Sequence, residues 1–171
     1  ASRGTPPGKA SGVVYGVTDQ LKGDRLNRVN SFAHVTHTSD AARVGVLLCI
    51  NGAGSLYAWL RAQMAEADMD YVAMEKLASE VAIGAENLQV LPFGNGAERL
   101  LQNEPVGAHV MNINFARHQR GHVFRAGLEG IAFAFALGME AMKEVGIDLS
   151  IMRVGNDNLF QSDIFSTTLS T

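Results

Sequence analysis

Cysteine is nearly absent from this chain of 171 residues, and its one example, Cys49, has no partner for an internal disulfide. Such cysteine usage is typical of the reducing cytoplasm, where we expect the protein to reside. Because Cys49 stands among apolar residues, we interpret it as a buried side chain and not as a nucleophile.

Positive charge and long apolar runs are also scarce. The 14 lysines and arginines are outnumbered by 17 acidic residues, and the formal net charge is -3. No basic surface for nucleic acid is indicated. The apolar run Val44–Ile50 is far shorter than the about 20 residues that span a bilayer. Residues 1–7 lack the apolar core of a signal peptide. We therefore expect neither nucleic-acid nor membrane binding.

What is present has the composition of a folded domain, with 47% apolar and 18% charged residues. Short apolar or β-branched runs predict strands at Gly12–Thr18, Val29–Thr36, Arg43–Ile50, Leu88–Phe93 and Leu149–Val154. Helical periodicity predicts helices after Ser55, over Tyr71–Val81, over His118–Val145 and after Asn158. This order of elements indicates an α/β domain.

Local signals add detail to these elements. The turn at 22–24 makes Val29–Thr36 the expected hairpin partner of the first strand. Asp70 is the expected N-cap of the second helix, and Gly146 fits the position after the end of the long one. Apolar faces are predicted for the first helix at Leu56, Trp59, Leu60 and Met64, and close packing is predicted for the long helix at Gly127, Gly130 and Gly138.

Two segments share one design, in which an apolar strand is followed by small residues and then by the start of a helix. They are 48–56 and 152–160. Glycine permits close approach of backbone to a ligand, and the N–H groups of a helix N-terminus favour phosphate. We predict that the two turns face one cleft and hold opposite sides of one nucleotide. The alternative is that both are ordinary strand–helix turns, since neither completes a Walker A or a Gly-x-Gly-x-x-Gly motif.

The histidines raise the question of a metal site. His118 and His122 are spaced to share a helix face, and His34 and His37 lie close together. No Glu completes a His-Glu-x-x-His motif and no thiol joins either pair, so ordinary hydrogen-bonded histidines are favoured and no metal ligand is predicted. A solvated face or an interdomain contact is expected for three arginines, Arg117, Arg120 and Arg125.

Four segments, in chain order, resemble one protein family. Arg125–Ala134 follows the pattern Arg-Ala-x-x-Glu-Gly-x-x-Phe-Ala, and Leu91–Arg99 follows Leu-Pro-(Phe/Tyr)-x-x-Gly-Glu-Arg with one extra residue. Gly54–Leu60 ends in the Trp-Leu pair of a third motif, and Gly155–Asn158 is similar to a late Gly-Gly-x-x-(Ser/Asn) turn. The chain thus resembles the C-terminal half of the FGGY carbohydrate kinases, and within that family most resembles the xylulokinases.

This resemblance implies an α/β domain of the actin/hexokinase-like, or ribonuclease H-like, ATPase fold, with a mixed sheet flanked by helices. Residues 1–171 would be the C-terminal, ATP-binding domain of a two-domain enzyme that transfers phosphate from ATP·Mg²⁺ to a ketose, D-xylulose above others. The sugar would bind mainly in the N-terminal domain, which we expect to precede this chain. The family's aspartate base is also expected upstream, so no catalytic residue is assigned here.

The resemblance also implies a set of contacts to ATP. In the family, Gly-Thr-Ser-Gly precedes the first strand, whereas this chain has Lys9-Ala10-Ser11-Gly12, so no phosphate contact is assigned to Ser11. Asn156 stands where a small residue is usual. The expected nucleotide-binding residues are Gly12, Gly54, Ser55, Ala58, Gly155, Asn156 and Asn158.

Three questions stay open at this point. The protein is either a kinase or an ATP-binding relative that no longer phosphorylates, because a fold does not fix a function. The substrate is either xylulose or another sugar or polyol such as ribulose, glycerol or fuculose. A homodimer is an arrangement that the sequence neither requires nor rules out.

Overall fold

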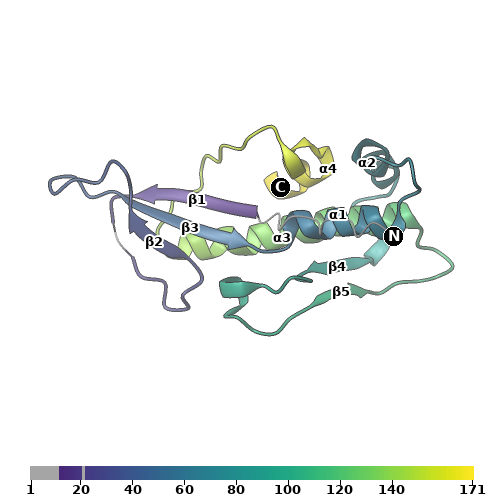
Figure 1. Ribbon diagram of the computed structural model, residues 1–171, viewed down its shortest axis with the longest axis horizontal. Helices are drawn as coiled ribbons and strands as arrows, with labels where there is room; N and C mark the ends of the chain where they lie inside the picture. Colours follow the sequence, from purple (N-terminus) through teal and green to yellow (C-terminus); the bar gives the residue numbers. More distant parts are fainter. Residues whose placement is uncertain (1–11, 21) are drawn as a thin grey trace, which may run out of the picture.

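The computed structural model describes residues 12–20 and 22–171 and is elongated along its longest helix (Figure 1). Its strands are β1 (Gly12–Thr18), β2 (Asn30–Ala33), β3 (Val44–Ile50), β4 (Gln89–Pro92) and β5 (Ala108–Met111). Its α-helices are α1 (Ala53–Met64), α2 (Tyr71–Ser79), α3 (Arg120–Glu144) and α4 (Asp163–Ser170). Short 3₁₀ helices are η1 (Ala85–Asn87), η2 (Glu98–Leu101) and η3 (Asn158–Gln161).

The first sheet has the order β1-β3-β2, with both pairs antiparallel. The central strand β3 carries apolar side chains on both faces and is buried or half-buried along its length, which suits it to the middle of a sheet. The predicted hairpin between the first two strands is therefore wrong: β2 pairs with β3, not with β1. The turn at 22–24 marks the end of a strand correctly but does not select the strand's partner.

A second, two-stranded sheet joins β4 and β5, with Leu91 opposite His109. The pattern of the sequence predicts β4 but no strand at β5. The reason is that the four residues of β5 are mostly exposed and lack the apolar alternation by which a half-buried strand is recognised.

Helix α3 is the element against which most others pack, as Figure 1 shows along its whole length. Three of its glycines make this packing close. A β-carbon at Gly127 would lie 2.7 Å from Leu60 Cδ1 of α1, and one at Gly138 would lie 2.6 Å from Leu48 Cδ2 of β3. A β-carbon at Gly130 would overlap the carbonyl of Val90 in β4. The predicted role of these glycines is confirmed.

The predicted helix ends are also confirmed. The Asp70 carboxylate accepts a hydrogen bond from the N–H of Ala73 at 2.8 Å and caps α2. Gly146, with φ 88°, follows α3 in the left-handed conformation that glycine tolerates. The predicted apolar face of α1 needs one correction, because Trp59 is 53% exposed and Tyr57 is buried in its place.

A buried ion pair fixes the connection between α2 and β4. Glu129 Oε1 accepts hydrogen bonds from Arg125 Nε at 2.8 Å and from the N–H of Gly84 at 3.1 Å, while Arg125 Nη1 donates to the carbonyl of Val81 at 2.9 Å. Residues 84–87 all have positive φ, a backbone conformation that is unfavourable for residues with a side chain. The pair thus holds an unfavourable turn against α3.

No strand forms at Leu149–Val154, where the sequence predicts one. The side chain of Asp148 instead accepts hydrogen bonds from the N–H and the hydroxyl of Ser150, at 2.9 and 3.0 Å. Such local bonds compete with strand pairing. The segment runs beside β1 but is separated from it by a cavity of about 440 Å³. Within the described part of the chain, no helix has the length and apolar character needed to cross a membrane.

Candidate functional site

The first turn of α1 has the features of an anion-binding helix start. β3 leads into Gly52, whose φ of 81° turns the chain, and no side chain caps the helix. Gly54 and Ser55 follow, both half-buried. The turn is held in place by Asn51, whose Nδ2 donates to the carbonyl of Asn95 at 2.8 Å. Backbone N–H groups at such a helix start are available to a phosphate oxygen.

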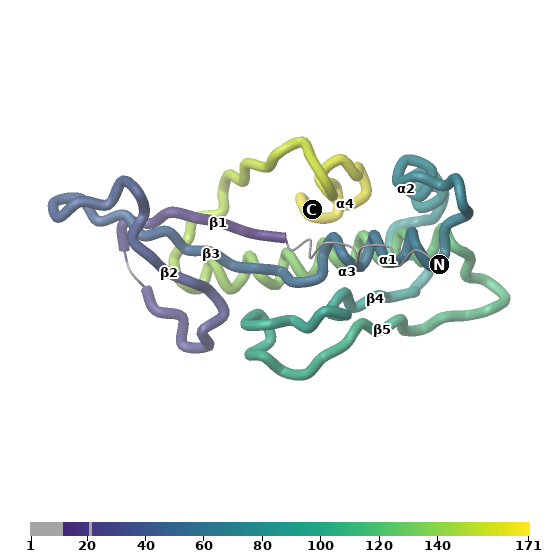
Figure 2. Tube along the Cα trace, viewed as in Figure 1, coloured from purple at the N-terminus to yellow at the C-terminus, as the bar shows by residue number. Residues whose placement is uncertain are grey.

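Gly12 lies at the same end of the sheet as this turn, because it pairs with Ile50, the last residue of β3. A β-carbon on Gly12 would overlap the ring of Phe135. Phe135 in turn meets Phe160 of η3 and Phe165 of α4 edge to face, at 6.4 and 5.5 Å between ring centroids. Phe135 therefore connects the start of β1 with η3 and α4. In Figure 2 the start of β1 lies near the C-terminal helix.

The second predicted turn, Gly155–Asn158, is exposed. Asn158 begins η3 with φ 48°, a left-handed conformation that asparagine adopts more readily than most residues. The carbonyl of Asn156 accepts a hydrogen bond from Gln161 Nε2 at 3.4 Å. Because no strand precedes this turn, the expectation that Gly155 lies at the carboxyl end of a strand is wrong.

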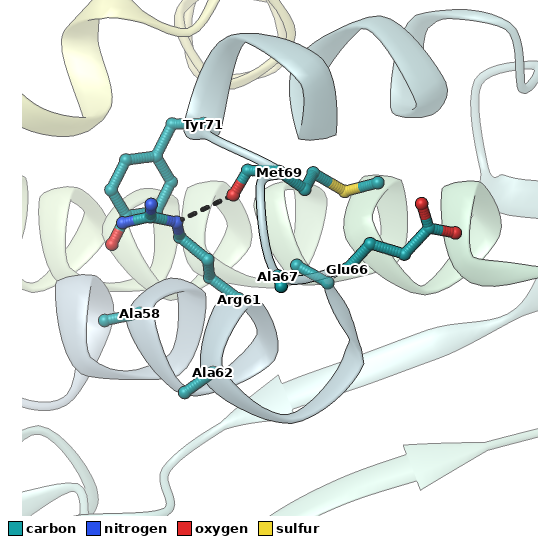
Figure 3. A pocket seen from close by; sticks show the side chains of 8 residues that line it. Ala58, Arg61, Ala62, Glu66, Ala67, Met69 and Tyr71 are labelled. Atoms are coloured by element: carbon teal, nitrogen blue, oxygen red, sulfur yellow. Dashed lines mark hydrogen bonds between the residues drawn. The ribbon is translucent and has the colours of Figure 1, made fainter.

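Two hollows contain predicted residues. One, of about 300 Å³, lies between α1 and α2 and is lined by Ala58 (Figure 3). There Arg61 lies 4.9 Å from the centroid of the Tyr71 ring, and its Nε donates to the carbonyl of Met69 at 3.0 Å. The other is the cavity beside β1, which is lined by Gly155. Ala58 and Gly155 therefore face different hollows.

The paired histidines of α3 and the preceding loop have structural partners. The Nδ1 of His118 accepts the N–H of Asn114 at 2.9 Å, and the Nδ1 of His122 accepts the N–H of Gln119 at 3.1 Å. In the neutral ring this leaves the proton on Nε2. Across the described residues, no group of three or more His, Cys, Asp or Glu side chains is placed to hold a metal ion.

Several aspartates also have structural roles. Asp24 is hydrogen-bonded to the side chain and the backbone N–H of Arg28. Burial raises the pKa of the Asp24 carboxyl, but these hydrogen bonds outweigh burial and the net shift is downward. Asp70 caps α2, and Asp148 closes a turn with Ser150 whose hydrogen bonds lower its pKa. The lowered pKa values of Asp24 and Asp148 make these two carboxylates weak bases.

One feature near the second turn was not predicted from the sequence. Glu75 of α2 accepts hydrogen bonds from the hydroxyl of Ser162 at 2.7 Å and from the N–H of Ile164 at 3.0 Å. Ser162 itself precedes an apolar helical stretch, which is an N-cap signal. The sequence offers no comparable signal that a glutamate 87 positions earlier would join it.

Comparisons with known proteins show similarity to carbohydrate kinases. Xylulose kinase of Haemophilus influenzae is 26% identical over 87 residues, which are 51% of this chain and 17% of that protein. The crystal structure of xylulose kinase from Rhodospirillum rubrum matches with a TM-score of 0.75 at 22% identity, over 93% of this chain and 30% of that one. Plasmodium falciparum glycerol kinase, solved with ADP, matches with a TM-score of 0.71 at 18% identity, over 95% and 31%.

The chain spans less than a third of each of these proteins. The structural likenesses confirm the predicted actin/hexokinase-like ATPase fold. The model of one family, described as the FGGY family of carbohydrate kinases, C-terminal domain, matches residues 13–155. Since that match covers most of the sequence, this chain belongs to the FGGY family of carbohydrate kinases.

Proposed function

We propose that this chain is the ATP-binding half of a sugar kinase, and that the acceptor is a ketose, D-xylulose above others. The family match over 13–155 is the observation that carries the proposal. The relative from Haemophilus influenzae, a xylulose kinase, supports the choice of sugar. In the reaction, the bond between the γ-phosphorus of ATP and the oxygen that leaves with ADP breaks, and the γ-phosphorus forms a bond to a sugar hydroxyl oxygen. The proton of that hydroxyl passes to a base.

The described residues suit the ATP phosphates. The first turn of α1 is uncapped, carries no acidic side chain and is built from Ala53, Gly54 and Ser55. Its N–H groups would hold phosphate oxygens, and the small side chains would let the phosphates approach the backbone. Mg²⁺ would neutralise charge that develops on the phosphates, and it is commonly bound through them with few protein ligands.

The adenosine would lie between two segments, which line the hollow between α1 and α2 and the cavity beside β1. One is the start of α1, with Gly54, Ser55 and Ala58; the other is the turn from Gly155 to Asn158. Gly12, at the start of β1, would lie beside the start of α1, because it pairs with the last residue of β3. In this arrangement, backbone groups and small side chains would do most of the binding.

An ADP-release assay tests the proposal. The complete gene product is assayed with ATP and Mg²⁺ against D-xylulose, D-ribulose, L-fuculose and glycerol. D-xylulose should give the highest kcat/KM. The glycerol kinase likeness at a TM-score of 0.71 makes glycerol the second candidate acceptor. A protein that binds ADP but forms no ADP from ATP with any of these acceptors would refute the kinase assignment. That result would favour an ATP-binding relative that does not phosphorylate.

A second assay uses residues 1–171 alone. Because the base and most of the sugar site are expected elsewhere, this piece should release no ADP in response to sugar, and at best should bind ADP weakly in calorimetry. Sugar-dependent ADP release clearly above background would show that a base lies in this chain.

A further inference from the structure

The carboxylate of Glu75 joins two helices that are far apart in sequence. It lies on α2, and its two oxygens accept from Ser162 Oγ at 2.7 Å and from the N–H of Ile164 at 3.0 Å, at the start of α4. Ser162 Oγ also accepts the N–H of Phe165 at 3.0 Å. Glu75 and Ser162 together therefore occupy N–H groups that a helix start leaves without partners.

Helix α4 depends on such contacts because it has only eight residues. Helices of that length are not stable on their own in water. Its N-terminus also carries the positive end of the helix dipole, and the Glu75 carboxylate is the matching charge. Phe165 anchors the other side of the first turn in the aromatic cluster with Phe135.

The position of Ser162 decides what this contact controls. It follows η3 (Asn158–Gln161) directly, and Asn158 is the last residue of the turn proposed to meet adenosine. Fixing Ser162 therefore fixes the downstream end of that turn. The upstream side of the turn is exposed and is not held by a strand.

The same face of α2 contacts α1. Tyr71 lies one helical turn before Glu75, so the two share a face of α2. The ring of Tyr71 stacks on that of Tyr57 in α1, with centroids 5.7 Å apart. The guanidinium carbon of Arg61, also in α1, lies 4.9 Å from the centroid of the Tyr71 ring. Helix α2 is thus bound to α1 through Tyr71 and to α4 through Glu75.

We propose that Glu75 is a positioning residue for adenine nucleotide: it sets the turn before α4 at the correct distance from the start of α1. This inference rests on the proposed function, because it assumes that these two segments hold the nucleotide. The hydrogen bonds of Glu75 are to Ser162 and Ile164, and neither residue belongs to the two segments. It acts through Ser162, and its loss lets η3 and the turn move together.

The experiment uses the complete gene product and four variants: Glu75→Ala, Glu75→Gln, Ser162→Ala, and Glu80→Gln as a matched control. Glu80 is exposed and directly follows the last residue of the same helix. Dissociation constants for ADP are measured by calorimetry, and KM for ATP, KM for the sugar and kcat by ADP release. Thermal unfolding reports on the fold.

Glu75→Ala and Ser162→Ala should each raise the ADP dissociation constant and the KM for ATP by roughly 3- to 10-fold, the size of coupling that a neighbouring element transmits. The sugar KM should not change, and kcat at saturating ATP should be retained. Glu75→Gln keeps one acceptor oxygen and should have a smaller effect. A fifth variant, Glu75→Ala with Ser162→Ala, should lose less ADP affinity than the sum of the two single losses, because each single change already breaks the shared Glu75–Ser162 hydrogen bond. Glu80→Gln should match the wild type.

Two results would overturn the inference. One is unchanged ADP affinity in a folded Glu75→Ala protein. The other is an equal loss in sugar KM, kcat and ADP affinity, which would indicate a general structural role. If Glu75→Ala does not fold, Glu75→Gln and Ser162→Ala decide the matter by the same measurements. A wild-type protein that binds no ADP would refute the proposed function itself, before any variant is compared.

Discussion

Removing the carboxylate of Glu129 should be among the most damaging single changes in this chain. In Glu129→Ala the guanidinium of Arg125, about 10% exposed as a side chain, keeps its charge without its partner. The N–H of Gly84 loses its acceptor as well. Breaking a buried pair from one side costs about 3–5 kcal/mol. That is a large share of the about 5–15 kcal/mol by which domains are stable.

Urea unfolding followed by circular dichroism measures this cost. With an m-value of about 2 kcal/mol/M, the midpoint should fall by about 1.5–2.5 M. Glu140→Ala, at an exposed position on the same helix, is the control and should change the midpoint little. A loss below about 1 kcal/mol for Glu129→Ala would refute the reasoning, because it would mean that the arginine finds another partner or reaches water.

A double change separates charge from backbone satisfaction. Arg125→Met with Glu129→Leu removes both charges, and such replacements are often close to neutral. Here they also leave the N–H of Gly84 and the carbonyl of Val81 without their partners. We therefore expect the double variant to recover only part of the stability lost in Glu129→Ala.

Four further predictions concern single sites. The pKa of Asp24 is lowered in the folded state, so the stabilising effect of its carboxylate is present above the unfolded-state pKa and is lost as the pH falls through the folded-state pKa. Below about pH 4 the wild type should therefore lose more unfolding free energy than Asp24→Asn, as measured by urea titrations. Gly130→Ala should lower the unfolding free energy by about 1–3 kcal/mol because its methyl group overlaps β4, whereas Gly107→Ala, with open space around it, should not. Tyr57→Phe should raise the unfolding free energy by about 1 kcal/mol, since the hydroxyl of Tyr57 is buried without a hydrogen-bond partner among the described residues. A fall in the unfolding free energy of the same size would show that the hydroxyl has a partner after all. Gly155→Val should raise the KM for ATP of the complete gene product with little change in melting temperature, and unchanged ATP affinity would count against the proposed turn.

The helices were predictable because their signals are local. The apolar stripe of α3, the Asp70 cap and the glycine after the helix each lie within a few residues of what they determine. Strand partners are different, because a strand's sequence does not say which other strand it joins. Val29–Thr36 contains a real strand, yet its partner is β3 and not the strand that precedes it.

The candidate site was predictable only in part. The helix start at Gly54 and its neighbourhood with Gly12 agree with a nucleotide-binding end of the sheet. The Asp148–Ser150 turn, which competes with the expected strand before Gly155, depends on a local choice between two hydrogen-bonding patterns. Arg125 and Glu129 helped to identify the family, but in the structure they bind each other and the backbone between α2 and β4, not the proposed nucleotide site.

The close packing at Gly127, Gly130 and Gly138 of α3 has a consequence for how the chain folds during synthesis. Five elements that precede this helix in the chain, β1, β3, α1, α2 and β4, pack against it, and it begins only at Arg120. Until the ribosome has released the helix, about a hundred residues have no surface on which to complete a core. Such long-range contacts slow folding and leave intermediates with exposed apolar surface. We expect the emerging N-terminal part to depend on chaperones until α3 is released, and to fold around it in a single late step.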